Sequence, residues 1–382
     1  MERIPLTLLV SNLGLGGAER QVVQIANGLD RDQFVVSVLA LSEDNPLASD
    51  LADDVHFEVL PHASSFGADS LVALRRRLAE LGTQVVHGFL FEAEFLSRVA
   101  SLGRAQLRVI GSIRNSNYEI NRKRFWLKRL TDFRMDLCVS NSQAGIDYHQ
   151  AHYHLPDDRY RVVRNGVNTT RFQPRCATDN EHTLHELGLD PERPVIGVFA
   201  SFKRQKNHLT LLEAAELLEL QRPGVQYAFV GGELEPGQRN TDAYARQLMQ
   251  AVEESPIRSQ FHFLGKRKDV ERLYPACTLT ALPSWHEGLP NVLLESAVCG
   301  VPCIATDVSD NALLIEEYGL GCSVPAGDAQ AMADALEVAL RDGLTIRAEH
   351  LARVREDFSN ATMIRNMSSV YLSVLRDDLR AA

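Results

Sequence analysis

Two patterns of apolar residues alternate along this chain. Short runs rich in Val, Ile and Leu are typical of buried strands, whereas apolar residues spaced three and four apart are typical of helices that cover a sheet. In the first half, such runs predict strands at residues 6–10, 34–41, 55–60, 85–89, 107–112 and 137–140. Helical spacing predicts helices at residues 22–29, 71–81 and 93–100. This alternation predicts a parallel sheet covered on both faces.

The same alternation returns in the second half, after a break. Strands are predicted at residues 194–199, 225–232, 261–265, 277–282 and 319–325, with one more ending at residue 307. Helices are predicted at residues 209–220 and 328–340. Between the halves, residues 169–180 are polar and turn-rich and show neither period. A chain of 382 residues is too long for one ordinary core. We therefore predict two domains, residues 1–171 and 172–361, with their boundary near Phe172.

Composition narrows the class of protein. Hydrophobic residues make up 45% and charged residues 24%, as in ordinary globular proteins. The net charge of −10 disfavours nucleic acid as a partner, because a surface that binds nucleic acid is basic. No apolar run approaches the roughly 20 residues that cross a bilayer. Residues 4–10 lead straight into a glycine loop, as a first strand does and a signal peptide does not. We expect a protein that is soluble or at most peripheral to a membrane.

Six cysteines are scattered along the chain without metal-binding spacing. They are Cys138, Cys176, Cys277, Cys299, Cys303 and Cys322. None forms Cys-x2-Cys, and Cys299 and Cys303, on either side of a Gly-Val-Pro turn, are most simply buried apolar residues. These features predict reduced thiols, no structural zinc and a cytoplasmic location.

The most informative stretch is residues 283–302, which directly follow a predicted strand and read Pro-Ser-Trp-His-Glu-Gly-Leu-Pro-Asn-Val-Leu-Leu-Glu-Ser-Ala-Val-Cys-Gly-Val-Pro. Pro290 suits the first position of a helix, because its fixed φ fits the turn and its missing N–H would have no acceptor there. Gly300 ends that helix. Glu287 is thus expected in the loop at the carboxyl end of the strand, and Glu295 about a turn and a half into the helix.

The start of this helix offers a site for an anion. The first N–H groups of a helix have no acceptor within it, and the helix dipole favours negative charge beside them. Here these groups belong to Leu289, Asn291 and Val292, between Glu287 and Glu295. A phosphate flanked by two carboxylates, which accept hydrogen bonds from hydroxyl groups, is the arrangement that binds a sugar nucleotide.

The string Glu-Gly-Leu-Pro-Asn-Val-Leu-Leu-Glu-Ser-Ala at residues 287–297, with Cys-Gly-Val-Pro after it, resembles the donor-site signature of glycosyltransferase family 4. Enzymes of this family are retaining, use sugar nucleotides and have the α/β GT-B fold, in which two Rossmann-like doubly wound domains face a central cleft. The resemblance implies that Glu287 faces the donor sugar and Glu295 the ribose hydroxyls. The other implied donor-binding residues here are Gly288, Leu289, Pro290, Asn291 and Val292. The resemblance also implies that a C-terminal helix, residues 362–382, packs back on the first domain. The alternative is a solvated helix with two surface glutamates.

A second donor contact is expected in the loop at residues 200–208. In the family this loop carries an arginine and, five residues later, a lysine; they hold the donor diphosphate and neutralise the leaving group. Lys206 fits the lysine, whereas Ser201 stands at the arginine position. Lys203 or Arg204 could supply the missing charge, and Arg204 would offer bidentate phosphate geometry. The family places the nucleotide base beside two further strand ends, here Gly232 and Gly265.

The loop after the first strand, residues 11–20, contains Gly14, Gly16 and Gly17. A dinucleotide fingerprint would need a third glycine at Glu19, whose carboxylate crowds the helix, so nicotinamide binding is disfavoured. The Gly-Gly-Ala-Glu-Arg string resembles the family's N-terminal loop, which faces the cleft near the donor phosphates. Gly16 and Gly17 would let the backbone approach a phosphate or an acceptor hydroxyl closely. The alternative is a loop that only turns the chain.

Polar residues end two strands of the first domain, at the edge where open α/β sheets bind ligands. His87 ends one strand; the family often has a second histidine two residues on, but this chain has Phe89 there. His87 is therefore either a catalytic residue that touches the sugar or acceptor, or a histidine satisfied inside the domain. Arg114 and Asn115 are candidate acceptor-binding residues, although a strand-end arginine often pairs with a neighbouring carboxylate.

Residues 122–130, Arg-Lys-Arg-Phe-Trp-Leu-Lys-Arg-Leu, form the most basic run of an acidic chain. One interpretation is contact with an anionic membrane that holds a lipid-linked acceptor. The pattern favours the other interpretation, an amphipathic surface helix with Phe125 and Trp126 packed inward and the cations in solvent.

Taken with the resemblance, these features predict a retaining glycosyltransferase of polysaccharide or glycoconjugate biosynthesis. It would move a sugar from a UDP-, GDP- or ADP-sugar to a glycan or lipid-linked acceptor in the cytoplasm, and contact with the inner surface of the membrane is one interpretation. We expect no cofactor besides the nucleotide sugar and no metal requirement, because Lys206 and the helix start can stabilise the leaving group. The alternatives are a nucleotide-sugar epimerase of the same fold and a non-catalytic protein that binds sugar nucleotides.

Overall fold

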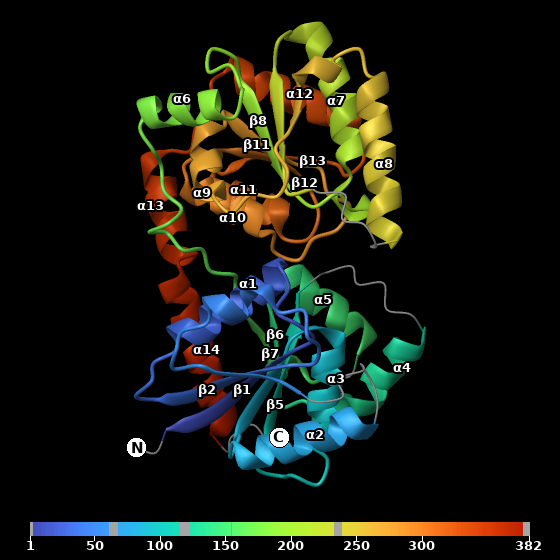
Figure 1. Cartoon of the computed structure of the whole chain (residues 1–382), viewed down its shortest axis with the longest axis vertical. Helices are drawn as coiled ribbons and strands as arrows, with labels where there is room; N and C mark the ends of the chain where they lie inside the picture. The colour runs from blue at the N-terminus through green and yellow to red at the C-terminus, as the bar shows by residue number, and fades with distance from the viewer. Residues whose placement is uncertain (1–2, 61–67, 115–121, 154, 233–238, 377–382) are drawn as a thin grey trace. The chain divides into compact units, whose positions relative to one another are not determined.

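The computed structural model describes residues 3–60, 68–114, 122–153, 155–232 and 239–376, except for the side chains of residues 239–242. The chain divides into two compact units. Unit 1 comprises Met1–Gly166 and Asn360–Ala382, and unit 2 comprises Val167–Ser359. Each unit is built on its own parallel sheet (Figure 1).

In the described part of unit 1, seven strands form a sheet in the order β3-β2-β1-β4-β5-β6-β7. They are β1 (Ile4–Val10), β2 (Phe34–Ala40), β3 (His56–Val59), β4 (Val85–Gly88), β5 (Arg108–Ile113), β6 (Leu137–Ser140) and β7 (Tyr160–Val162). Neighbouring strands run parallel throughout. The strand order reverses between β1 and β4. Open α/β sheets bind ligands beyond the carboxyl ends of the strands at such a point.

Successive residues of a strand point to opposite faces of the sheet. Both faces of this sheet carry apolar side chains, and helices cover both. Leu8 packs with the core beside α1 and α14, while Leu9 packs with the core beside α2 and α3. The helices are α1 (Gly17–Gly28), α2 (Ala68–Glu80), α3 (Leu90–Ala100), α4 (Arg122–Thr131), α5 (Gln143–His152) and α14 (Asn360–Leu375). Short 3-10 turns lie at η1 (Pro46–Asp50), η2 (Asp132–Arg134) and η3 (Asp157–Arg159).

Helix α14 belongs to unit 1 although it is the last helix of the chain. The chain leaves unit 1 after Gly166 and returns at Asn360. Met363, Met367 and Tyr371 of α14 are buried in the core that β1 and α1 share, and Figure 1 shows α14 beside α1. The final helix therefore completes the hydrophobic core of the N-terminal sheet.

The sheet of unit 2, over the residues described, has six parallel strands in the order β10-β9-β8-β11-β12-β13. They are β8 (Val195–Phe199), β9 (Gln226–Val230), β10 (Phe261–Phe263), β11 (Leu279–Leu282), β12 (Cys303–Thr306) and β13 (Gly321–Val324). The order reverses between β8 and β11. The loops after these two strands are therefore the place where this sheet would bind a ligand.

The helices of unit 2 bury apolar faces against this sheet or against each other. They are α6 (Ala177–Glu186), α7 (His208–Gln221), α8 (Arg239–Glu254), α9 (Val270–Leu273), α10 (Asn291–Val298), α11 (Asn311–Tyr318), α12 (Ala329–Arg341) and α13 (Ala348–Asp357), with 3-10 turns η4 (Arg204–Lys206), η5 (Arg258–Gln260) and η6 (Tyr274–Ala276). The sequence predicted no regular structure at residues 169–180, but α6 begins at Ala177. Its buried residues are Thr183 and Leu184, too few to give a helical period.

His208, the first residue of α7, is buried among aromatic rings in unit 2. Its ring centre lies 5.3 Å from that of Phe202 and 6.0 Å from that of Tyr244. Burial, and secondarily the charge of Lys206, lowers the pKa of His208 from 6.5 to about 3. Since its pKa is lower in the folded chain, the unfolded chain binds more protons below pH 6.5. This contribution to stability is complete above pH 6.5 and is lost as the pH falls toward 3.

Acid should therefore destabilise the fold through His208. Below pH 6.5, we expect this one group to lower the free energy of unfolding by up to about 1.4 kcal/mol per pH unit. A His208→Phe variant should show a shallower pH dependence than the wild type in urea unfolding between pH 6.5 and 4. Identical pH dependence in the two proteins would contradict the assignment.

Candidate active site

Strand β11 and helix α10 position the loop that carries Glu287. Residues 283–290, here called the signature loop, begin where the buried strand β11 ends, beside the reversal in strand order. Pro290 is the N-cap residue of α10, with φ −73°, so the helix starts one position later than the sequence predicted. The helix buries Leu293 and Leu294 and is followed by Gly300 at φ +80°, a left-handed conformation that favours glycine.

Glu287 is nearly buried, with 6% of its surface exposed. Its Oε1 accepts hydrogen bonds from Lys206 Nζ at 2.5 Å and from Ser284 Oγ at 2.6 Å. A carboxylate removed from water needs such partners, and the ammonium compensates its charge. Because an ammonium group has three donors, Lys206 can hold Glu287 and still donate to other oxygens.

Two hydrogen bonds to backbone carbonyl groups join the loop that carries Lys206 to the signature loop. Gln205 Nε2 donates to the carbonyl of His286 at 2.6 Å. In return, the N–H of Trp285 donates to the carbonyl of Gln205 at 2.8 Å. The loops after β8 and β11 are thus joined at two points besides the ion pair. This coupling fixes the position of Lys206 relative to Glu287.

The other residues of the Lys206 loop differ in exposure. Ser201 is half-buried, whereas Lys203 and Arg204 are exposed. The two exposed cations project from the same short loop as Lys206. Both Lys203 and Arg204 are thus available to an anion near Lys206, and the choice between them stays open, as it was in the sequence.

Glu295 of helix α10 is held by a tyrosine that the sequence did not single out. Tyr274 Oη donates to Glu295 Oε2 at 2.8 Å. The Tyr274 ring stacks on Phe199 at 3.8 Å between ring centres and has 1% of its surface exposed. Burial, followed by the charge of Glu295, raises the pKa of Tyr274 well above its usual value. The hydroxyl therefore stays protonated as a donor to the carboxylate.

Glycines mark the ends of two more strands of this sheet. The N–H of Gly231 donates to the carbonyl of Gly265 at 2.9 Å, so the turns after β9 and β10 lie side by side. Gly265 has φ +67°, which a side chain would strain. At Gly232, a Cβ atom would come within 2.0 Å of the Phe202 ring. Packing against Phe202 thus explains the glycine at residue 232.

The remaining residues of the signature lie at the junction of loop and helix. Gly288, Leu289 and Pro290 are buried, and Asn291 and Val292 are half-buried. The structure therefore brings Lys206 and Ser284 into contact with Glu287 and places the other residues of the signature along the same loop and helix.

In unit 1, Gly16 and Gly17 begin helix α1. Gly16 is the N-cap residue, with φ −81°. A Cβ atom on Gly16 would lie only 2.1 Å from Glu19 Oε2, so the missing side chain makes room for the carboxylate to fold back over the helix start. Glu19 is the third residue of the helix, the position from which a glutamate caps the N-terminus. Gly17 is exposed on the first turn.

His87 lies fully inside unit 1. Its Nδ1 is 2.9 Å from Tyr371 Oη and its Nε2 is 2.8 Å from Ser112 Oγ. Burial, and secondarily the charge of Arg114, lowers the pKa of His87 well below its usual value. A neutral ring with both nitrogens bonded to side chains matches the second alternative of the sequence analysis, a histidine satisfied within its domain. In this conformation the ring links β4, β5 and α14 and presents no nitrogen to a ligand.

Arg114 is half-buried at the end of β5. Its Nη1 donates to Asn165 Oδ1 at 3.1 Å, and its guanidinium carbon lies 5.1 Å from the centre of the Phe89 ring. Burial lowers the pKa of Arg114 to about 10. Phe89 thus supports Arg114 at the position where the family often has a histidine. Asn115, the other candidate acceptor residue, lies outside the described residues.

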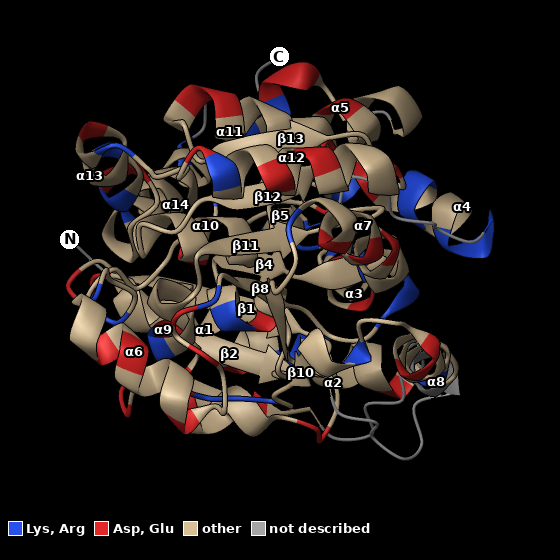
Figure 2. Cartoon of the chain, turned by 90° about the horizontal axis from the view of Figure 1, so that it is seen from above, with Lys and Arg blue, Asp and Glu red and all other residues tan. Residues whose placement is uncertain are grey.

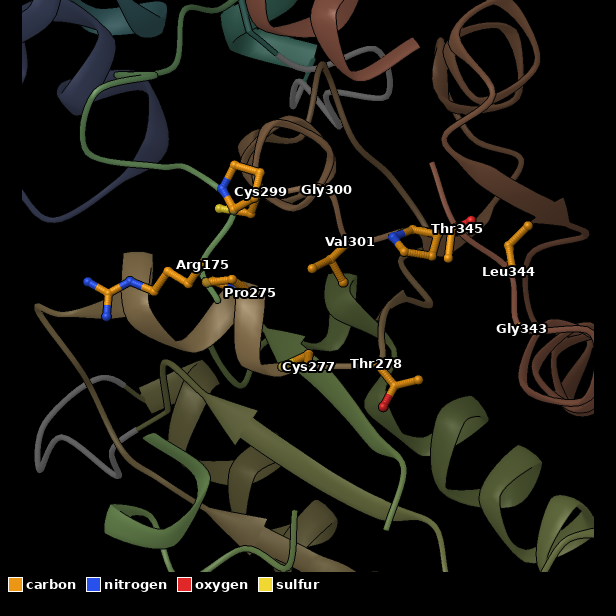
Figure 3. A pocket seen from close by; sticks show the side chains of 12 residues that line it. Arg175, Pro275, Cys277, Thr278, Cys299, Gly300, Val301, Gly343, Leu344 and Thr345 are labelled. Carbon is orange, nitrogen blue, oxygen red and sulfur yellow. The ribbon is translucent and has the colours of Figure 1, made fainter. Parts of the chain in front are cut away.

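A pocket of about 390 Å³ opens near the amino-terminal ends of strands β11 and β12 in unit 2 (Figure 3). It is lined partly by Cys277 and Thr278, just before β11, and by Val301 and Pro302, just before β12. Burial raises the pKa of Cys277 to about 12, so its thiol is protonated at neutral pH. Since the signature loop follows the carboxyl end of β11, this pocket is separate from the candidate site.

Two family models match the chain. Glycosyltransferase Family 4 matches residues 15–171, and Glycosyl transferases group 1 matches residues 193–342. With two Rossmann-like sheets, the protein is an enzyme of the GT-B class of glycosyltransferases, involved in glycoconjugate biosynthesis. The chain belongs to glycosyltransferase family 4. The fold and the family expected from the sequence are therefore confirmed.

The chain is similar to two named glycosyltransferases and to a solved structure. The lipopolysaccharide core biosynthesis mannosyltransferase LpsB of Rhizobium meliloti is 26% identical over 280 residues, 72% of this chain and 74% of LpsB. The UDP-Gal:alpha-D-GlcNAc-diphosphoundecaprenol alpha-1,3-galactosyltransferase of Escherichia coli is 25% identical over 341 residues, 84% of each chain. Among solved structures, HepE of Anabaena in complex with UDP has a TM-score of 0.83 and 21% identity, over 97% of this chain and 100% of HepE.

None of the helices within the described ranges is both long and apolar enough to cross a bilayer.

Three residues that orient the candidate donor groups were not predicted from the sequence. The sequence did contain a signal for Ser284, since a serine three residues before Glu287 at a strand end can donate a hydrogen bond to that carboxylate. Tyr274 and Gln205 had none, because Tyr274 is separated from Glu295 by strand β11 and Gln205 acts through the backbone of residue 286.

Proposed function

We propose that this glycosyltransferase transfers a sugar, with retention of anomeric configuration, from a nucleoside-diphosphate sugar to a glycan or lipid-linked acceptor. The observation that carries the proposal is the bond between Lys206 and Glu287. It places a cation and a carboxylate together beside the reversal in strand order of unit 2, where an open sheet binds its ligand.

In this proposal, the donor lies along the loops of unit 2. Lys206 and the N-terminus of α10 bind the diphosphate, and Lys203 or Arg204 adds the charge that Ser201 lacks. Glu287 accepts hydrogen bonds from the hydroxyl groups of the sugar, and Glu295 from those of the ribose. The turns at Gly232 and Gly265 lie next to the base. The acceptor site in unit 1 includes Arg114. The backbone N–H groups of Gly16 and Gly17 donate to a donor phosphate or to an acceptor hydroxyl.

The chemistry follows from the charge of the leaving group. As the bond from the sugar to the phosphate breaks, negative charge grows on the diphosphate, and Lys206 is already in place to stabilise it. We propose that the acceptor hydroxyl attacks from the same face and gives its proton to the departing phosphate oxygen. A double displacement would need Glu287 as the nucleophile. Two hydrogen bonds to its Oε1 weaken that nucleophile, which supports same-face attack.

Uridine is the first base to test. HepE has been solved with UDP-glucose, and the Escherichia coli galactosyltransferase is named for UDP-Gal. The experiment is a thermal-shift screen with UDP-, GDP- and ADP-sugars, since a ligand that binds only the folded state raises the melting temperature. The best donor is then incubated with glycan and lipid-linked acceptors, with and without EDTA, and the product is analysed by NMR.

A product with the anomeric configuration of the donor supports the proposal, and full activity in EDTA supports metal independence. An inverted product, or a melting temperature that no nucleotide sugar raises, would contradict it.

The hydroxyl group of Tyr274 should matter for donor binding. Tyr274→Phe removes the hydrogen bond to Glu295 and keeps the buried ring, so we expect nucleotide affinity to fall roughly tenfold, the scale of one hydrogen bond to a charged group. Tyr227→Phe is the matched control, because Tyr227 is equally buried in β9 and stacks on Phe261. Calorimetric titration of both variants makes the comparison. Equal affinities in the two would show that Tyr274 does not orient Glu295 for binding.

A further inference from the structure

The signature loop exposes a large aromatic side chain. Trp285 lies two residues before Glu287, and 40% of its surface is exposed. The benzene end of its indole ring lies against the loop after β13, where a Cβ atom on Gly327 would come within 2.2 Å of the ring atom Cη2. The backbone N–H of Trp285 donates to the carbonyl of Gln205 at 2.8 Å. These contacts fix the position of the ring, and the rest of its surface faces solvent.

An exposed carboxylate lies at the end of the neighbouring strand. Strands β11 and β12 are parallel neighbours, so the loops after them start side by side. Thr306 Oγ1 donates to the carbonyl of Ser284 at 2.6 Å, and the N–H of Asp307 donates to the carbonyl of Val324 at 2.7 Å. Asp307 therefore lies between the loop after β11, which carries Trp285, and the loop after β13, against which the indole ring lies.

The side chains of Trp285 and Asp307 have free hydrogen-bonding groups. Within the described ranges, neither the indole N–H nor the carboxylate of Asp307 forms a hydrogen bond or an ion pair with the rest of the chain. The first is a donor and the second an acceptor. Sugar hydroxyls can both donate and accept, and the C–H face of a pyranose ring packs against an aromatic ring. An exposed indole with a nearby free carboxylate is therefore suited to a pyranose.

The charge of this surface favours a neutral ligand. Asp328, the N-cap residue of α12, directly follows Gly327 and is exposed, as Asp307 is. Figure 2 shows further acidic residues along α12. These carboxylates would repel a phosphate or another anion. An uncharged sugar ring meets no such repulsion.

The order of the strands places this surface beyond the transferred sugar. The sheet runs β10-β9-β8-β11-β12-β13. In the proposed function, the base lies at the turns after β9 and β10, the diphosphate at Lys206 after β8, and the sugar at Glu287 after β11. Trp285 and Asp307 instead meet the loops after β12 and β13, on the opposite side of the signature loop from the diphosphate. The group that follows the transferred sugar in this order is the acceptor.

We infer that Trp285 and Asp307 form a subsite for a pyranose ring of a glycan acceptor, in addition to the acceptor contacts of unit 1. The indole ring stacks on the pyranose, and the carboxylate accepts a hydrogen bond from one of its hydroxyls. The inference rests on the proposed function for the position of the donor. Binding of a sugar ring to this surface can nevertheless be measured without any nucleotide.

Fluorescence tests whether a sugar ring reaches the indole. The chain has two tryptophans, so a Trp126→Phe variant reports on Trp285 alone. The probes are the methyl α-glycosides of glucose, galactose, mannose and N-acetylglucosamine. Sorbitol is the matched control, because it carries hydroxyl groups without a ring face. At least one glycoside should change the emission of Trp285 in a saturable way, and sorbitol should not.

Kinetics separate the acceptor from the donor. Trp285→Ala should raise the KM of the glycan acceptor roughly three- to tenfold, the scale of one aromatic contact, whereas Trp285→Tyr keeps a ring and should stay within about twofold of the wild type. Asp307→Ala should raise the acceptor KM as well. Donor affinity, measured by calorimetric titration, should be the same in all these proteins. Leu220→Ala is the control for an exposed apolar side chain outside the site, because Leu220 is 84% exposed on α7.

Three results would overturn the inference. They are a Trp285 emission that no glycoside changes, an acceptor KM that is equal in the wild type and folded Trp285→Ala protein, and a donor affinity that Trp285→Ala lowers. The last would place the indole at the donor instead. A chain that binds no nucleotide would contradict the proposed function, and the glycoside titration would still decide whether a sugar ring binds at Trp285.

Discussion

Replacing Glu287 by Gln is expected to lower turnover by about two to three orders of magnitude, the scale seen when one preorganised electrostatic group is removed from an active site. The amide keeps the shape of the side chain but removes the charge that meets Lys206 at 2.5 Å. Lys206→Met should have an effect of similar size, because the departing diphosphate then lacks its cation. Steady-state rates with the donor identified by thermal shift give the measurement.

A matched control distinguishes the site from a general effect of lost charge. Glu337 pairs with Arg341 on the outer face of α12 at 2.9 Å, and Glu337→Gln should keep wild-type activity. Circular dichroism must show that the Glu287 and Lys206 variants are folded, since each substitution leaves the charge of the other residue, which is largely buried, without its partner. Wild-type turnover in folded Glu287→Gln protein would remove Glu287 from the reaction.

Replacing Arg98 by Met should cause the largest loss of stability in unit 1. Arg98 is 1% exposed and donates to Asp132 Oδ1 at 2.8 Å and to the carbonyl of Lys128 at 3.0 Å. It also pairs with the buried carboxylate of Glu94. Breaking a buried ion pair by removing one partner costs about 3–5 kcal/mol, because the other charge stays buried without compensation. Urea unfolding followed by circular dichroism measures the loss.

The exposed pair on α12 again provides the comparison. Arg341→Met should change the free energy of unfolding by less than about 1 kcal/mol, as surface ion pairs do. A similarly small change for Arg98→Met would mean that the network is not needed to hold α3, α4 and η2 together.

The local sequence pattern predicted the backbone elements that carry Glu287 and Glu295. Strand β11, the loop at Glu287 and the start of helix α10 follow one another in sequence, so a run of apolar residues, a proline and a glycine are enough to define them. The two parallel α/β sheets could be predicted for the same reason, because parallel α/β units repeat a local alternation, whereas the GT-B fold was implied by the family resemblance of the signature. The short strand β7 was missed, since three residues that include an exposed Arg161 give no period.

Contacts between distant segments could not be predicted. His87 bonds to Tyr371, 284 residues away, so its environment depends on the return of α14 to unit 1. On α4, the sequence favoured an inward position for both aromatic residues. Adjacent residues of a helix point about 100° apart. Phe125 therefore packs inward while Trp126 faces solvent, and the favoured prediction was wrong for Trp126.

Calorimetric titration tests most directly whether the loops after β8 and β11 bind a nucleoside diphosphate through Lys206. UDP, GDP and ADP are titrated into the wild type, Lys206→Met and the surface control Arg341→Met. We expect one site for one of these nucleotides, with an affinity that is unchanged in the control and about 10- to 100-fold weaker in Lys206→Met, as for lost hydrogen bonds to a charged group. Equal affinity in all three proteins, or no binding of any of the three nucleotides, would contradict it.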